Sequence, residues 1–158
     1  MFEFRQYPPL TDGEVDLVLW GQHASDAARG WVPSYDFRIV QHGTRTRLGS
    51  LSLRVGDTEH VRLYVGHIGY GIAPPHRGHR YAASACQIVA RVALDHGLED
   101  LWITCNPDNL ASRRTCEIIG ARFVELVEVP RGSEMYRQGE TRKCRYLWRP
   151  GALGVVLP

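Results

Sequence analysis

The sequence lacks the features that direct a chain to nucleic acid or to a membrane. Its formal net charge is only +2, which gives little bulk attraction to a polyanion or an anionic lipid surface. No apolar run approaches the length that spans a bilayer. The N-terminal stretch MFEFRQYPPL also lacks the basic and then apolar pattern of a secretory signal. We therefore expect a cytoplasmic protein with neither nucleic acid nor a membrane as partner.

Metal-binding and dinucleotide-binding motifs are also missing. The four cysteines show no C-x-x-C pairing and lie in apolar segments: Cys86, Cys105, Cys116 and Cys144. This pattern is typical of buried free thiols in a reducing compartment, and it predicts no metal site. The absence of G-x-G-x-x-G disfavours a dinucleotide-binding fold.

At 158 residues the chain is expected to form a single domain over residues 1–158, since it contains no repeat, linker or low-complexity tract. The segment 150–158 reads as a C-terminal tail. Its sequence after Pro150, GALGVVLP, is apolar, so it would pack either on the domain or on a second subunit. A monomer and a homodimer both remain open.

The apolar periodicity predicts a mixed α/β (α+β) domain. Period-two or short apolar runs favour strands over residues 3–7, 35–41, 48–55, 60–72, 101–105, 122–129 and 142–148. Helical spacing favours helices over residues 11–22, 78–96 and 110–119, the first capped by Thr11 with Glu14 in capping-box spacing. A short helix or loop is expected near residues 23–33, and a loop over 131–140.

The most informative stretch is IAPPHRGHRYAASA, Ile72 to Ala85. Pro74 and Pro75 force a turn, and the turn leads directly into a helix of small residues. A helix N-terminus exposes unpaired N–H groups and the positive end of the helix dipole, which together bind phosphate well. Arg77 and Arg80 add charge. The turn therefore fits a phosphate or pyrophosphate, although a basic loop that is merely solvated is the alternative for this segment alone.

Two motifs together resemble the GNAT superfamily of acetyl-CoA-dependent N-acetyltransferases. The first is the turn just described, RGHRYA, preceded by Ile72 and Pro74. The second, NPDNLASRRTCEIIGARF, is similar to the family's N-x-x-S/A…E-x-x-G-F segment at Asn109, Ala111, Ser112, Glu117, Gly120 and Phe123. The resemblance implies a mostly antiparallel central sheet of about six to seven strands, splayed between the fourth and fifth strands and flanked by about four helices.

The resemblance also implies acetyl-CoA as the acetyl donor, and direct transfer to a primary amine of a small molecule or a protein. The backbone at Gly71, Ile72 and Ala73 would receive the pantetheine arm. Asn109 of the second motif would contact that arm or fix the gap where the fourth and fifth strands splay, and Ser112 would also bind the cofactor. The pyrophosphate would lie on the turn formed by Arg77, Gly78, His79, Arg80, Tyr81 and Ala82.

The chain departs from the family pattern at two positions. Arg80 stands where glycine is common, and a positive φ there would cost roughly 1 kcal/mol. Cys116 stands where many members carry a tyrosine that protonates the departing thiolate; a thiol has a suitable unperturbed pKa of about 8.5, but a buried helix cysteine is the plainer interpretation. His67 and Glu125 are the candidate general bases, with Glu59 and Tyr146 as weaker catalytic candidates.

The acceptor is not specified by the sequence. Trp31 and Tyr136, in the two poorly patterned segments, are the candidates to line its pocket. Two other functions stay open. A non-catalytic acyl-CoA-binding module would keep the turn without the acid, as Cys116 suggests. A nucleotide-binding or nucleic-acid-binding domain could use the same basic turn, although the low net charge disfavours it.

Overall fold

The structure is a computed structural model that describes residues 1–153. Eight strands form two antiparallel sheets, ordered β1-β2-β3-β4-β5 and β6-β8-β7. The strands are β1 (Leu10–Thr11), β2 (Val15–His23), β3 (Ser34–Gln41), β4 (Arg47–Arg54), β5 (Ile68–Ile72), β6 (Leu101–Cys105), β7 (Arg122–Glu128) and β8 (Arg142–Trp148). The mixed α/β class and the mostly antiparallel pairing are confirmed, with eight strands in place of six to seven.

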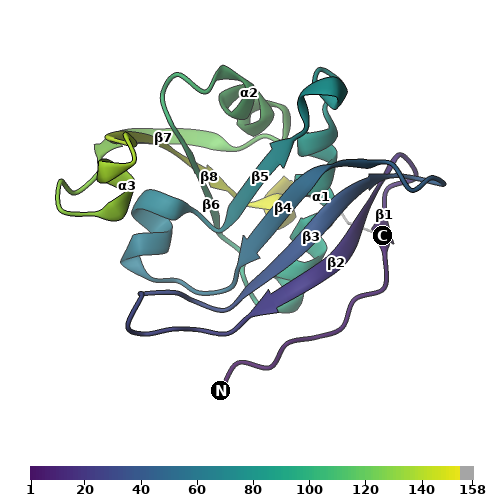
Figure 1. Cartoon of the computed structure of the whole chain (residues 1–158), viewed down its shortest axis with the longest axis horizontal. Coiled ribbons are helices and arrows are strands. Elements are labelled where there is room, and N and C mark those ends of the chain that lie inside the picture. The colour runs from purple at the N-terminus through teal and green to yellow at the C-terminus, as the bar shows by residue number, and fades with distance from the viewer. Residues whose placement is uncertain (154–158) are drawn as a thin grey trace.

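Three α-helices accompany the sheets within residues 1–153: α1 (Tyr81–Asp95), α2 (Leu110–Ile118) and the single-turn α3 (Glu134–Arg137). A π-helical turn covers Val61–Val65, and 3₁₀ turns cover Pro74–His76 and Pro150–Leu153. In Figure 1, α1 lies behind the five-stranded sheet, while α2 lies above the region where β5 and β6 separate. Among the described helices, none is long and apolar enough to cross a membrane.

The main core lies between α1 and the inner face of the five-stranded sheet. Alternate residues of the sheet are buried because successive side chains of a strand point to opposite faces; Tyr35, Phe37 and Ile39 on β3 are at most 1% exposed. Small and β-branched residues of α1 meet them. The β3–β4 hairpin, α1, β6, α2, β7 and β8 all lie close to their predicted bounds.

The helix predicted over residues 11–22 is wrong, because β2 occupies most of it. Asp12 accepts hydrogen bonds from the main-chain N–H groups of Glu14 (2.8 Å) and Val15 (2.9 Å), which closes a turn rather than a capping box. Val15 and Leu17 are then fully buried. The alternation Val15, Leu17, Leu19 outweighs the helical spacing because pairing with β3 buries it.

The strand predicted over residues 3–7 is also wrong, since residues 1–9 are irregular. This segment packs aromatic rings against the core instead: the rings of Phe4 and Tyr7 lie 5.3 and 5.7 Å from that of Tyr35. The Arg5 main-chain N–H also donates to the Tyr35 hydroxyl at 2.8 Å. In the predicted strand 60–72, only residues 68–72 are extended.

The last strand is more buried than its alternation predicts. Besides Cys144, Tyr146 and Trp148, the charged residues Lys143 and Arg145 are only 6% exposed. Each has an acidic partner, Glu140 at 2.8 Å and Glu125 at 3.1 Å respectively. The apolar tail is described only as far as residue 153, so most of the prediction for it falls outside the described residues.

Candidate functional site

The two sheets meet at one end of β5 and β6 and then separate. The His67 main-chain N–H donates to the Trp102 carbonyl at 2.7 Å, and the Trp102 N–H donates to His67 Nδ1 at 2.9 Å. Beyond this junction the two strands belong to different sheets and diverge, as Figure 1 shows. This is the splay expected between the fourth and fifth predicted strands.

Gly66 allows the two strands to approach this closely. Its φ is +74°, and a Cβ atom at this position would lie 2.9 Å from the Trp102 carbonyl oxygen and 3.1 Å from the Thr104 nitrogen. A side chain therefore conflicts with the backbone of β6 as well as with the left-handed conformation. Glycine at this position fixes where the splay begins.

One edge of β5 is left unpaired within the described chain, since β5 ends its sheet. Odd-numbered residues bond toward β4: the His67 carbonyl accepts from the Arg54 N–H, and the Ala73 N–H donates to the Leu48 carbonyl. Main-chain groups alternate in direction along a strand. Tyr70 and Ile72 therefore point their main-chain groups toward the splay, and the pantetheine contacts expected at Gly71, Ile72 and Ala73 stay a prediction.

The turn after β5 has the backbone that its sequence predicts. Arg80 takes a left-handed conformation (φ 62°, ψ 24°) directly before α1, and Gly78 has φ +91°. Arg77 Nε donates to the Ile72 carbonyl at 2.9 Å. The side chain of Arg77 thus fastens the turn to the end of β5, a structural role that the sequence does not reveal.

The N-terminus of α1 carries no side-chain cap. Its first N–H groups, on Tyr81, Ala82 and Ala83, have no acceptor within the helix. The N-terminus of α2 differs, because Asn109 Oδ1 accepts from the Ser112 N–H at 3.1 Å. Asn109 therefore caps the start of α2, while the N–H groups at the start of α1 have no side-chain acceptor.

These elements enclose a cavity of about 530 Å³. Its wall contains most of the predicted cofactor residues: Gly71, Ile72, Arg77, Gly78, His79, Arg80, Tyr81, Ala82, Asn109 and Ser112. Ala73 does not line it. The described lining also includes Arg114 and His76 but no carboxylate. An elongated ligand with an anionic end fits this arrangement of helix N-terminus, cations and free strand edge.

His67 is placed in the junction rather than in the cavity wall. It is 1% exposed, and burial lowers its pKa. Its Nδ1 lone pair already accepts from Trp102. The neutral imidazole therefore connects β5 to β6, and its role as a general base stays a prediction.

Glu125 lies on β7, where it accepts a hydrogen bond from Arg145 at 3.1 Å. Arg145 is buried and stacks on Trp102, with its guanidinium carbon 4.1 Å from the ring centroid. Half of the Glu125 side chain is exposed (51%). The carboxylate thus neutralises a buried cation, and its catalytic role stays a prediction.

Cys116 is fully buried on α2, and burial raises the pKa of its thiol to about 12. It is not among the residues lining the cavity. Tyr146 is also buried, and its hydroxyl accepts from Arg113 Nε at 3.2 Å. Neither group is presented to the cavity, so the proton-donor role of each stays a prediction.

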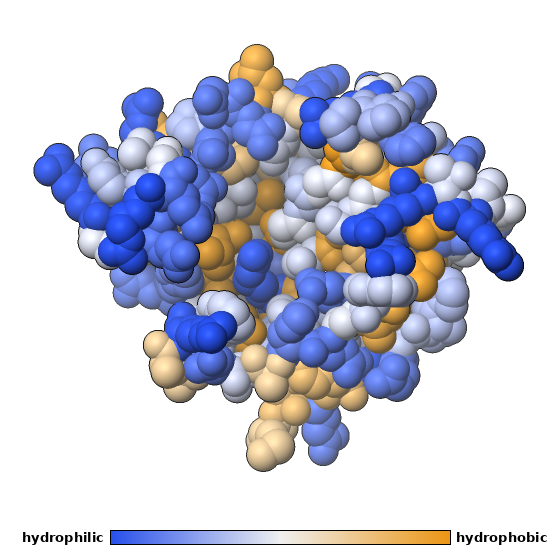
Figure 2. Space-filling model, viewed as in Figure 1, coloured by the Kyte–Doolittle hydropathy of each residue, from blue (hydrophilic) through white to orange (hydrophobic). Residues whose placement is uncertain are grey.

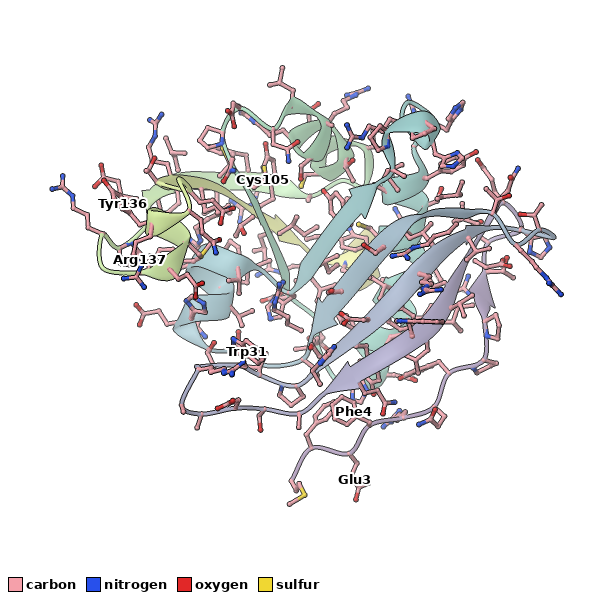
Figure 3. The ribbon with its side chains drawn as sticks, viewed as in Figure 1. Glu3, Phe4, Trp31, Cys105, Tyr136 and Arg137 are labelled. Atoms are coloured by element: carbon pink, nitrogen blue, oxygen red, sulfur yellow. The ribbon has the colours of Figure 1, made fainter. Side chains whose placement is uncertain are left out.

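The two candidate acceptor residues are not brought together. Trp31 lines a second cavity, of about 350 Å³, with His23, Asp36 and Arg54. Tyr136 lies on α3, and Figure 3 shows the π-helical turn between it and Trp31 in this view. Figure 2 shows apolar surface inside the hollow of this face, surrounded by hydrophilic residues.

Sequence reasoning missed two groups of polar residues. Tyr70 on β5 lines the first cavity; it appears in the sequence as one more β-former. In the second cavity, Asp36 lies 2.6 Å from His23 Nε2 and accepts from Ser52 Oγ at 2.7 Å. Asp36 and Ser52 alternate with the buried residues Tyr35 and Leu53 along β3 and β4, so the sequence places both on the outer face of the sheet. Only the strand register shows that they pair with each other.

A comparison with protein families identifies the class. The sequence model of the acetyltransferase (GNAT) domain matches residues 3–122, and the chain belongs to this family. No curated protein matches the sequence.

Solved structures of acetyltransferases share the fold. One from Agrobacterium tumefaciens has 16% identity and a TM-score of 0.62, over 94% of this chain and 98% of that one. The microcin C7 self-immunity acetyltransferase MccE, solved with acetyl-CoA and AMP, has 16% identity and a TM-score of 0.54 over 73% of this chain. The ribosomal-protein-S5-alanine acetyltransferase from Vibrio fischeri has 13% identity and a TM-score of 0.56 over 74% of this chain. This chain spans 61% of the length of MccE and 62% of the length of the Vibrio fischeri enzyme.

Proposed function

We propose that the chain transfers an acetyl group from acetyl-CoA directly to a primary amine of a small molecule or a protein. The single observation that carries this proposal is the cavity of about 530 Å³ between β5, the basic turn and α2. It combines an unpaired strand edge with an uncapped helix N-terminus. The amides of the pantetheine arm can hydrogen-bond to the strand edge, and the negatively charged pyrophosphate can bind at the helix N-terminus.

In this proposal the backbone of Tyr70 and Ile72 holds the pantetheine arm, and the N–H groups of Tyr81 and Ala82 bind the pyrophosphate. Arg80 and Arg114 add charge from the turn and from α2. The relative MccE, which was solved with acetyl-CoA, supports the choice of donor. The reaction needs no resident cofactor beyond this donor.

The acceptor amine would enter through the second cavity. There an ammonium ion would compete with His23 for the Asp36 carboxylate and with Arg29, 4.7 Å from the ring centroid, for the Trp31 face; a negative charge and an aromatic face are its two usual partners. The ammonium must lose a proton before it attacks. The nitrogen then bonds to the thioester carbonyl carbon, the C–S bond breaks, and CoA leaves.

The test is an assay of CoA thiol release from acetyl-CoA, with a panel of primary amines that includes amino acids, polyamines and peptides with free N-termini. Amine-dependent thiol release, with the acetylated amine seen by mass spectrometry, is the expected result. Asp36→Asn should raise KM for the amine and leave the affinity for acetyl-CoA unchanged.

The alternative is a non-catalytic acyl-CoA-binding module, which the buried Cys116 favours because it supplies no accessible acid. That function predicts acetyl-CoA binding without thiol release for every amine. The monomer and homodimer alternatives are separated by light scattering of the same preparation.

A further inference from the structure

Tyr70 extends across the cavity from one wall to the other. It lies on β5, and of the β5 residues that line the cavity it is the farthest from the basic turn along the strand. Its hydroxyl is 2.8 Å from Ser112 Oγ and 3.4 Å from the Ser112 carbonyl, both on α2. The side chain thus bridges the two elements that the splay separates.

Cys116 leaves this part of the cavity without an acid from α2. It follows Ser112 by four residues, so the two share one face of the helix. Cys116 is buried and is not among the lining residues, whereas Tyr70 is one of them. The phenol that α2 lacks is therefore supplied from the facing strand.

We propose that the Tyr70 hydroxyl donates a hydrogen bond to the sulfur of CoA as the C–S bond breaks. This inference rests on the proposed function, and it makes Tyr70 a catalytic residue. A donor aimed at developing negative charge stabilises the transition state more than the ground state. The Ser112 hydroxyl, 2.8 Å from the same oxygen, can donate to it, which leaves the phenol proton for the sulfur.

The protonation state of Tyr70 suits a hydrogen-bond donor. Burial raises its pKa, so the phenol keeps its proton throughout the range in which an amine reacts. The electron pair of the broken C–S bond stays on sulfur. The amine loses its own proton to water, and the thiolate takes one from water on release, so Tyr70 is unchanged after each turnover.

The test is the thiol pKa of bound CoA, followed by thiolate ultraviolet absorbance, in the wild-type protein and in Tyr70→Phe. Phenylalanine keeps the ring and removes only the hydroxyl. The variant should raise the pKa of the bound thiol by about one unit or more and lower kcat about 10- to 100-fold, as expected for a hydrogen bond to a charged group. The affinity for acetyl-CoA should stay nearly unchanged.

Tyr7→Phe is the matched control. This tyrosine also donates a hydrogen bond, to Asp95 at 3.0 Å, at the other end of α1, and its loss should change neither quantity. An unchanged thiol pKa and kcat in Tyr70→Phe, with acetyl-CoA still bound, would overturn the role of Tyr70 alone. Failure of the wild type to bind acetyl-CoA would overturn both this role and the proposed function.

Discussion

Arg80 combines an unfavourable backbone conformation with a positive charge beside the cavity. It is the only non-glycine residue with positive φ among residues 1–153 (φ 62°). The left-handed conformation costs a residue with a Cβ atom about 1–2 kcal/mol. Arg80 is also one of the residues that line the cavity. Strain of this kind at a site is consistent with a ligand-binding role.

Arg80→Gly should therefore separate stability from binding. Relief of the strain is partly offset by the greater freedom of glycine in the unfolded chain, so the variant should gain up to about 1 kcal/mol in unfolding free energy. Its affinity for acetyl-CoA should fall. Urea unfolding and calorimetric titration measure the two, and a less stable variant would contradict the assignment of strain.

Protonation of His67 predicts how stability depends on pH. Burial lowers its pKa in the folded protein, whereas in the unfolded chain the pKa is about 6.5. As pH falls below about 6.5, the unfolded chain binds the proton first, so the contribution to stability is full above this pH and is lost as pH falls through the folded pKa. His96 shifts in the same direction, also through burial.

The measurement is the urea midpoint of the wild type and of His67→Gln between pH 5 and pH 8. The wild-type midpoint should fall on acidification. Glutamine keeps an acceptor for the Trp102 N–H but does not titrate. The urea midpoint of the variant should therefore depend less steeply on pH, and His96 should account for the remaining dependence. Equal slopes in the two proteins would show that His67 does not carry this dependence.

Among the elements, those with a single plausible period were predicted correctly. The helix α1 has small apolar residues at helical spacing, and the β3–β4 hairpin alternates cleanly around its turn. The segment at residues 11–22 fits both periods, and a local capping pattern favoured the wrong one. Pairing with β3 decides it, and no local pattern contains that information. For the same reason the sequence did not reveal that Tyr70 contacts Ser112, since the two lie 42 residues apart in the chain.

The beginning of the splay depends on Gly66, and this can be tested with a matched pair of substitutions. Gly66→Ala must adopt φ +74° and also contacts the backbone of β6. Gly43→Ala adopts almost the same φ (+75°) in the β3–β4 turn, with no atom within 4 Å of its Cβ. We expect a loss of about 1 kcal/mol for Gly43→Ala and about 2–4 kcal/mol for Gly66→Ala.

Thermal or urea unfolding gives both values. If the two substitutions cost the same, the backbone contact of Gly66 has no energetic weight, and the close approach of β5 and β6 is maintained by other contacts.

For the whole molecule, the cavity exists because two sheets meet at one end and separate at the other. The resemblance to the GNAT family implied that arrangement, and the strands on either side confirm it. What the sequence could not reveal was which main-chain groups face the splay, since that depends on the register of β5 with β4. The acceptor side depends likewise on residues far apart in the chain.

The measurement that tests the central claim most directly is a calorimetric titration of acetyl-CoA into the wild-type protein and into a double variant, Arg77→Ala with Arg80→Glu. Arg45→Glu, in the exposed β3–β4 turn, controls for a change of charge alone. We predict micromolar binding to the wild type and to the control. The double variant should bind at least about 10-fold more weakly, because Arg80 no longer offers a charged hydrogen bond, which contributes about 1.5–3 kcal/mol, and Arg77 no longer fastens the turn to the Ile72 carbonyl. Wild-type protein that does not bind at millimolar acetyl-CoA would contradict the account.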